Sequence, residues 1–313
     1  MKKTVSKALC LLLVVLLILP AMSVSASTVT RTKHYTIVGL ESGNAVQKAV
    51  IYGGYIYVIQ HNGKDSWLTQ CKISGETATR VGKRMVLKNF GHAQSLEAFE
   101  YRGKTYFWVN CKNNSSSDWN WGIQVARIQF EAGKTVKYTS CPRLTFGSVD
   151  RVEFALSSNT SEILFWVKDG SKYTYSAYKT AAINKKLDEK EKEQSHYINV
   201  SNFEKIFSTT TGANLFPKYD GKISNQGLEF TNKRSIYAAG GHAGDSLRIF
   251  KLVRSGNGYK LKKSVTLGTI GKKGEIEGLQ IKGDRLYFCI TDKSKKKDKG
   301  RFVVYSILKS EFD

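Results

Sequence analysis

The sequence predicts an all-β protein, because a pattern typical of a β-hairpin recurs five times along the chain. Each copy has a polar residue, a spacer, an aliphatic residue and usually an acid or amide. A short turn rich in Gly, Asn, Lys and Asp follows, and a second apolar run comes after it, which is the pattern of two strands joined by a tight turn. The copies begin near residues 47, 94, 150, 226 and 277.

The spacing of the copies predicts a five-bladed β-propeller. Successive copies begin 47, 56, 76 and 51 residues apart, and blades of four strands repeat at roughly 40–50 residues. Residues 122–130, 247–253 and 301–307 are apolar or alternating runs that suit outer blade strands. The alternative is a large β-sandwich, which would not require five-fold recurrence.

The longest interval predicts a short helical insertion between the third and fourth copies. Residues 181–193 are rich in charge and in helix formers, and residues 202–207 suit a second helical turn. We expect the charged stretch 185–193 to be a solvated face, whose deletion would leave the fold intact.

The N-terminus predicts export. Three lysines precede an apolar run at residues 9–19, and Val24-Ser25-Ala26 is a small-residue processing site. The run is short for a membrane span of about 20 residues. Residues 1–26 are therefore expected to be a cleaved signal peptide, and residues 27–313, which contain no Pro- or Ser-rich linker, a single secreted, extracellular propeller domain without a membrane span.

The net charge predicts an anionic partner. Without residues 1–26, which hold three lysines and no acid, the formal charge falls from +23 to +20. Outside a cell the abundant polyanions are teichoic acids, anionic lipids and acidic polysaccharides, so nucleic acid is not expected as a partner. The basic tract 293–301 reads as an exposed turn. Its polyanion contacts are expected to be Lys295, Lys296 and Lys297.

Signatures of an enzyme or a metal site are sparse. The chain has no H-E-x-x-H, no G-x-S-x-G and no P-loop. Three histidines, His61, His92 and His242, lie at or near the repeat copies, and loop hydrogen bonding is the simpler role for them. No cofactor is expected, although a metal ion on the propeller axis stays open. The four cysteines of the mature chain are widely spaced, without C-x-x-C, and predict no particular disulfide pairing: Cys71, Cys111, Cys141 and Cys289.

Alternation along each first strand separates an aliphatic face from a polar one. Matching positions on the polar face hold Glu97, Glu153, Glu229 and Gln280, with Val50 as the exception. Buried carboxylates need hydrogen-bond partners, so these residues are either structural latches between blades or the polar floor of a central channel.

Two tryptophans, Trp119 and Trp121, lie in a polar loop. Such side chains either cover the core of a blade or stack on a sugar or a membrane interface.

Several segments resemble the helveticin J family of large bacteriocins. They are 47–61, Gly91-His-Ala-Gln-Ser-Leu-Glu97, Gln226-Gly-Leu-Glu229 and Glu277-Gly-Leu-Gln280. The resemblance covers about residues 35–310 and extends more distantly to five-bladed propeller heads of phage receptor-binding proteins and teichoic-acid-associated wall proteins. It implies a secreted antibacterial protein acting at the wall or membrane of related Gram-positive cells.

The resemblance and the repeat together predict binding residues and a function. The expected binding residues are His92, Gln94, Glu97, Trp119, Trp121, Glu153, Gln226, Glu229, His242, Glu277 and Gln280. The expected function is a non-enzymatic bacteriocin that binds an anionic wall polymer or another envelope receptor and kills the cell by cytolysis. A wall-polymer hydrolase and a non-lytic wall- or glycan-binding adhesion module are the alternatives.

Overall fold

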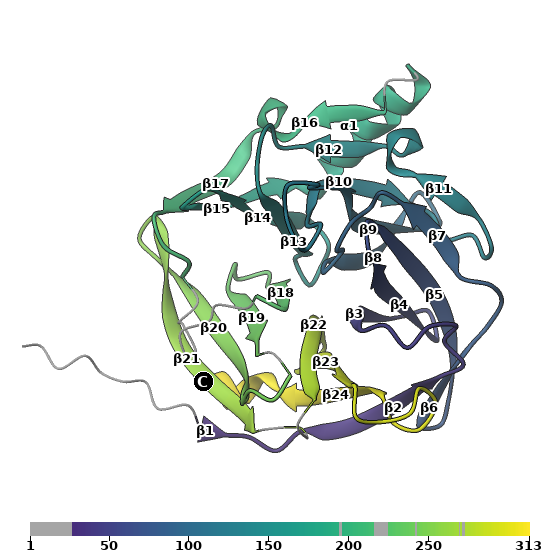
Figure 1. Cartoon of the computed structure of the whole chain (residues 1–313). Coiled ribbons are helices and arrows are strands. Elements are labelled where there is room, and N and C mark those ends of the chain that lie inside the picture. Colours follow the sequence, from purple (N-terminus) through teal and green to yellow (C-terminus); the bar gives the residue numbers. More distant parts are fainter. Residues whose placement is uncertain (1–26, 194–195, 216–224, 242, 269, 271–272) are drawn as a thin grey trace, which may run out of the picture.

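The protein is built almost entirely of β-strands, which form sheets around a central axis (Figure 1). The computed structural model describes residues 27–313, apart from 194–195, 216–224, 242, 269 and 271–272. The expected signal peptide, residues 1–26, and His242 lie outside the described residues. The prediction of an all-β protein is confirmed, and the arrangement is that of a β-propeller.

Every predicted repeat copy forms an antiparallel hairpin. The first strands are β3 (Val46–Tyr52), β8 (Leu96–Tyr101), β13 (Arg151–Leu156), β18 (Gly227–Phe230) and β22 (Gly274–Lys282). Their partners are β4 (Tyr55–Asn62), β9 (Lys104–Asn113), β14 (Glu162–Asp169), β19 (Ile236–Gly240) and β23 (Arg285–Asp292). The first strands lie nearest the axis, and each contacts the next around the ring, β22 returning to β3.

Three of the copies form separate sheets through additional outer strands. The second copy continues through β10 (Gly122–Ile128), β12 (Arg143–Thr145) and β16 (Tyr197–Asn199). The third continues through β15 (Lys172–Lys179) and β17 (Lys205–Thr211). The fourth continues through β20 (Leu247–Ser255), β21 (Gly258–Gly268) and β1 (Ser27–Thr28).

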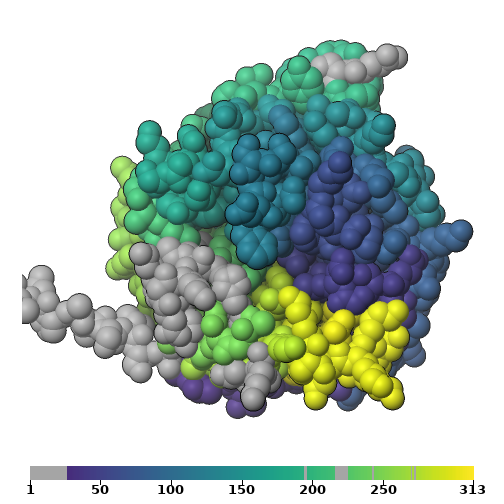
Figure 2. Space-filling model, in the orientation of Figure 1, coloured from purple at the N-terminus to yellow at the C-terminus, as the bar shows by residue number. Residues whose placement is uncertain are grey.

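The first and fifth copies share one ten-stranded sheet. The first copy continues through β5 (Asp65–Ser74), β6 (Thr77–Arg80), β7 (Met85–Lys88) and β11 (Thr135–Lys137). The fifth continues through β24 (Phe302–Leu308) and β2 (Thr32–Val38). A parallel pairing of β2 with β6 joins the two halves, and the antiparallel pairing of β2 with β24 brings the two ends of the described chain together. Figure 2 shows the purple N-terminal and yellow C-terminal segments side by side on one face.

The core consists of five clusters, each between two neighbouring copies. For example, Phe90 and Leu96 pack with residues of the first hairpin, and Phe154 packs with Trp108 between the second and third copies. Similar clusters separate the third from the fourth copy, the fourth from the fifth and the fifth from the first. Each sheet therefore buries both of its faces against its neighbours.

The predicted helical insertion is present as α1 (Thr180–Lys192), between the third and fourth copies. Ile183 and Leu187, four residues apart on one face, are fully buried in the core between the second and third copies. The expectation that 185–193 is only a solvated face is therefore wrong in part, because this stretch contributes Leu187 to the core.

The expected second helical turn at residues 202–207 is also wrong. A short 3-10 turn ends at Asn202, and the Thr-rich segment after it forms β17, which pairs with β15. β-Branched residues favour such an outer strand. The short 3-10 turns are η1 (Tyr138–Ser140), η2 (Val200–Asn202) and η3 (Lys309–Phe312).

Candidate functional site

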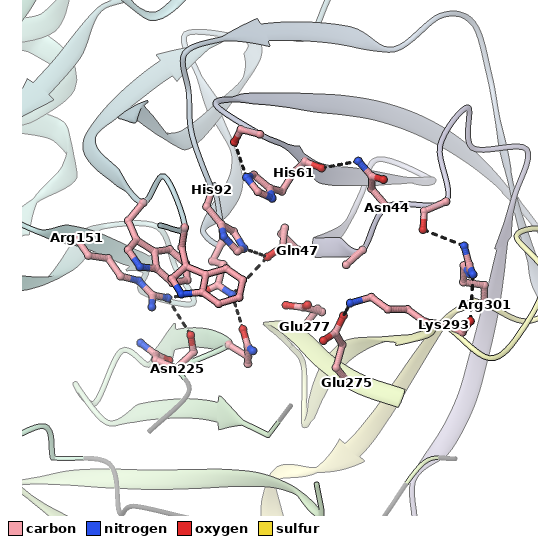
Figure 3. A pocket seen from close by; sticks show the side chains of 17 residues that line it. Asn44, Gln47, His61, His92, Arg151, Asn225, Glu275, Glu277, Lys293 and Arg301 are labelled. Atoms are coloured by element: carbon pink, nitrogen blue, oxygen red, sulfur yellow. Dashed lines mark hydrogen bonds and ion pairs between the residues drawn. The ribbon is translucent and has the colours of Figure 1, made fainter. Parts of the chain in front are cut away.

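The inner strands begin around a cavity of about 720 Å³, here called the axial cavity (Figure 3). Because the five hairpins point the same way along the axis, the opening polar residues of four copies meet here: Gln47, Gln94, Gln226 and Glu277. In the third copy the residue after the opening Asp150, Arg151, lines the cavity instead. The remaining lining residues are Gly43, Asn44, Ala45, His61, Gly63, His92, Trp119, Trp121, Asn225, Glu275, Lys293 and Arg301.

Two glycines allow the fourth and fifth copies to approach closely at the axis. The Gly278 amide donates a hydrogen bond to the Gln226 carbonyl at 2.7 Å. A Cβ atom on Gly227 would lie 2.8 Å from the Gly278 carbonyl carbon. Glycine is therefore required in both Gln-Gly-Leu-Glu and Glu-Gly-Leu-Gln, and the close approach places Gln226 beside Glu277.

An aromatic stack forms one wall of the cavity. The His92 ring lies between His61, at 4.3 Å, and Trp121, at 4.4 Å between ring centroids. The His92 Nε2 atom is 2.5 Å from the Gln47 Oε1 atom, to which it donates a hydrogen bond. Burial lowers the pKa of His92 well below its usual range, and His61 and Arg151 lower it further. His92 is therefore neutral near pH 7.

Arg151 connects this wall to the other side of the cavity. Its guanidinium group lies 3.6 Å from the Trp121 ring centroid and donates to Glu153 at 2.8 Å. It also donates to the Asn225 carbonyl at 2.9 Å and to the Gln94 side chain. These contacts hold the second, third and fourth copies together around one positive charge.

The fifth copy supplies two carboxyl groups to the cavity, Glu275 and Glu277 (Figure 3). Lys293 Nζ lies 2.7 Å from Glu275 Oε1. Glu277 is 3% exposed, and among the described residues its Oε2 atom has no hydrogen-bond partner. Burial raises the pKa of Glu277 well above its usual range, Glu275 raises it further, and Lys293 and Arg151 only partly oppose this. These surroundings therefore favour the neutral, protonated form of the Glu277 carboxyl.

The axis beyond the cavity is filled by a buried ion-pair cluster. Lys48 Nζ lies 2.7 Å from both Glu97 Oε1 and Glu229 Oε1, and Lys48 is 1% exposed. Burial alone would lower the pKa of Lys48, but the charges of Glu229 and Glu97 raise it. Lys48 was not predicted from the sequence, although a lysine within the largely apolar strand 46–51 is a visible signal of a buried charge.

The polar positions further along the inner strands pair between copies and do not line the cavity. Glu153 accepts a hydrogen bond from Ser95 at 2.5 Å, and Glu229 accepts one from the Ile281 amide at 3.0 Å. Gln280 accepts one from the Ile51 amide at 2.8 Å. Together with the Lys48 cluster, these contacts join neighbouring copies. They correspond to the structural latches between blades, one of the two alternatives predicted for these positions from the sequence.

Of the expected binding residues, the structure gathers His92, Gln94, Trp119, Trp121, Gln226 and Glu277 at the axial cavity. Lys295, Lys296 and Lys297 lie outside it, in the predicted turn, with Lys295 and Lys296 exposed. Several cavity residues were not identified because they are brought in by loops and strand ends outside the repeated pattern: Asn44, Asn225, Glu275, Lys293 and Arg301. Gln47 could have been found as the opening polar residue of the first copy.

The cysteines and histidines form no metal site in the described part of the chain. No group of three or more His, Cys, Asp or Glu residues there could hold a metal ion. All four described cysteines are buried free thiols, and burial raises the pKa of Cys71 and of Cys141 to about 12. Within the same residues, no helix has the length and apolar character needed to cross a membrane.

Comparison with known protein families decides the family. A family model described as "Bacteriocin helveticin-J" matches residues 25–310. The chain belongs to the helveticin J family. The resemblance inferred from the repeat segments is thereby confirmed. No curated protein matches this helveticin J family member.

Solved structures resemble the helveticin J family chain at low identity. An α-L-arabinofuranosidase from Lactobacillus brevis is 8% identical, with 83% of this chain and 90% of that chain covered and a TM-score of 0.46. A β-1,3-galactosidase of glycoside hydrolase family 43, bound to galactodeoxynojirimycin, is 7% identical, with 85% and 90% covered and a TM-score of 0.47. Likeness at this level does not extend to activity.

Proposed function

We propose that the protein is a secreted bacteriocin that binds the anionic envelope of related Gram-positive bacteria and kills them by cytolysis. The observation that carries the proposal is the family match over residues 25–310. The formal charge of +23, or +20 without residues 1–26, supports an anionic target.

The proposal includes a five-bladed propeller, with one blade for each repeat copy. The ring of contacts β3, β8, β13, β18 and β22 supports this count, as do the five core clusters between neighbouring copies. The ten-stranded sheet then consists of the first and fifth blades, joined edge to edge through β2 and β6. Pairing of β2 with β24 closes the ring by combining strands from both ends of the chain.

In this function, recognition and long-range attraction belong to different parts of the molecule. The axial cavity offers aromatic faces, amides and carboxyl groups for binding a terminal or internal sugar of an envelope polymer. Lys295, Lys296 and Lys297 add a positive field beside it, because they belong to the same segment as the lining residues Lys293 and Arg301. We therefore propose a teichoic acid or a similar anionic wall polymer as the receptor.

A spot-on-lawn assay with purified protein on related Gram-positive strains tests the killing. Trp119→Ala should reduce the zone of killing, because Trp119 lines the cavity and is 61% exposed, so its loss does not disturb the core. Tyr197→Ala is the matched control, since Tyr197 is 55% exposed and lines neither the axial cavity nor its neighbouring hollow. Wall binding without killing on any strain would instead indicate the adhesion module.

A wall-polymer hydrolase is the second candidate, and one observation favours it. Glu277 combines a raised pKa with an unpartnered oxygen in the cavity, which suits a general acid, and the ion-paired Glu275 lies in the same cavity. Release of reducing sugar or phosphate from purified walls tests this candidate. Hydrolysis that Glu277→Gln abolishes would support it, and killing without any release would contradict it.

A further inference from the structure

A second hollow, of about 450 Å³, adjoins the axial cavity and is here called the outer hollow. The two share four lining residues, Trp119, Trp121, Arg151 and Asn225. The outer hollow is lined in addition by Asn114, Asp150, Trp166, Lys168 and Tyr173. The loop that carries Trp119 and Trp121 therefore presents lining atoms to two adjacent concave sites.

Both sites offer aromatic rings to a ligand. Trp119 belongs to both linings, and its side chain is among the most exposed large apolar groups of the described residues. In the outer hollow the rings of Trp166 and Tyr173 lie 5.8 Å apart. Amphipathic aromatic rings suit the apolar C–H faces of sugars, which also carry hydroxyl groups at their edges. Each hollow thus has a surface on which one sugar ring can pack.

Polar atoms without partners occur where the two sites meet. Asn225 is 6% exposed, and neither Nδ2 nor Oδ1 of its side chain has a hydrogen-bond partner among the described residues. In the axial cavity, Glu277 Oε2 also has no hydrogen-bond partner among the described residues. Buried polar side chains are nearly always hydrogen-bonded. Hydroxyl groups of a bound glycan would supply the donors and acceptors that these three atoms lack.

The charges lining the axial cavity favour an anionic ligand. Three cations and two carboxyl groups line the axial cavity, and among the described residues Arg301 donates only to backbone carbonyls, while burial raises the pKa of Glu277 and favours its neutral form. In the outer hollow Lys168 pairs with Asp150 at 2.7 Å. Arg151 belongs to both linings and places a guanidinium group, paired with Glu153, at the junction.

We propose that the two hollows are consecutive subsites for one chain of an anionic glycopolymer. One glycosyl unit occupies the axial cavity, the next occupies the outer hollow, and the charged linkage between them lies beside Arg151. The inference rests on the proposed envelope binding. It adds that the protein binds at least two consecutive repeats of the polymer.

Calorimetric titration with wall teichoic acid fragments of one to six glycosylated repeats, prepared from a strain that the protein kills, tests the proposal. Affinity should rise at least tenfold between one and three repeats and then level off. A fragment of three repeats can place any one of its repeats in a single site. This larger number of binding positions would by itself raise the affinity only about threefold. Tyr173→Ala should leave single-repeat binding unchanged and remove the gain with length, whereas Tyr197→Ala should behave as the unchanged protein.

The outcomes separate this inference from the function on which it rests. Equal affinity for one and several repeats, or an equal loss at every length in Tyr173→Ala, would overturn the two-subsite inference and leave envelope binding in place. Failure of the unchanged protein to bind fragments of any length would overturn both.

Discussion

Gly278 shows how one residue fixes the geometry of the axis. Its φ of +59° lies in the left-handed region, and a Cβ atom there would come within 2.7 Å of the Lys48 side chain. The same residue produces the irregular register between Glu277 and Gln280. A side chain at this position would displace Lys48 from Glu97 and Glu229. The buried ion-pair cluster and the irregular register beside Glu277 therefore both depend on one glycine.

We expect Gly278→Ala to destabilise the protein well beyond the cost of a left-handed alanine, which is about 1 kcal/mol. The excess arises because the new methyl group displaces Lys48, and a buried ion pair that loses its geometry costs about 3 kcal/mol or more. Gly283→Ala is the matched control, since Gly283 has φ +61° and nothing within 4 Å of its Cβ position. Urea unfolding of both variants measures the difference, and equal losses would contradict the steric role of Gly278.

Glu277 predicts a pH dependence. The folded protein holds a proton on Glu277 where the unfolded chain, with a pKa of about 4.5, has released it. The free energy of unfolding therefore falls as the pH rises from about 4.5 through the raised folded pKa. Glu277→Gln should remove this contribution, so the variant gains stability relative to the unchanged protein as pH increases. Denaturant unfolding between pH 4 and pH 8 gives the difference, and parallel curves would mean that the Glu277 pKa is not raised.

At the scale of elements, the hairpins were predictable because their signals are local. Strand alternation and turn residues such as Gly53-Gly54 fall within about 15 residues of each other, so all five copies were located from the sequence. The outer connections were not predictable, because pairings such as β2 with β6 or β12 with β16 depend on distant segments. The cavity was half predictable for the same reason: the repeat gives Gln94, Gln226 and Glu277, while Asn225 and Lys293 come from loops.

Helix α1 has a structural role that its charged sequence conceals. Asp188 Oδ1 lies 2.5 Å from the guanidinium group of Arg127, and Asp188 Oδ2 accepts a hydrogen bond from Tyr101 at 2.8 Å. Arg127 is 2% exposed and also donates to Asn184. The insertion therefore neutralises a cation buried in the sheet of the second copy.

We expect Asp188→Ala to lower the free energy of unfolding by about 3 kcal/mol, because it leaves the buried Arg127 with only the more distant Glu191 carboxylate, at 3.6 Å. Glu189→Ala, on the same helix, should cost much less, since among the described residues Glu189 forms an ion pair only with the exposed Lys186. Thermal or urea unfolding distinguishes the two. Equal stability of both variants would restore the view of this stretch as a solvated face, and deletion of residues 185–193 should then also be tolerated.

For the whole molecule, the separation of charge from recognition follows from where the groups lie. Most cations are on the outside, where the Debye length of about 8 Å at 0.15 M salt lets them attract a polyanion before contact. The cavity instead contains buried groups whose contacts are short-ranged and little affected by salt. Affinity and selectivity for an envelope polymer should consequently respond to different substitutions.

Binding to purified Gram-positive walls should weaken steeply between 0.05 and 1 M salt, because the Debye length shortens to about 3 Å at 1 M. Neutralising Lys295, Lys296 and Lys297 to Gln should lower the affinity at low salt and flatten this dependence, since these side chains lie beside the cavity. The same change at Lys260, Lys262 and Lys263 on the outer strand β21 is the matched control. This control removes the same number of positive charges from the protein. It should lower the affinity for the walls less than the change at Lys295, Lys296 and Lys297 does.

Trp119→Ala completes the test, because it should reduce binding by a similar factor at every salt concentration and reduce the selectivity between strains. Extraction of teichoic acid from the walls should remove the salt-dependent component for all variants. Binding that stays constant up to about 1 M salt, or that is equal on walls with and without teichoic acid, would exclude a polyanionic receptor. The axial cavity would then have to recognise a neutral glycan, and the high positive charge would need a different explanation, since salt-insensitive binding cannot arise from long-range attraction.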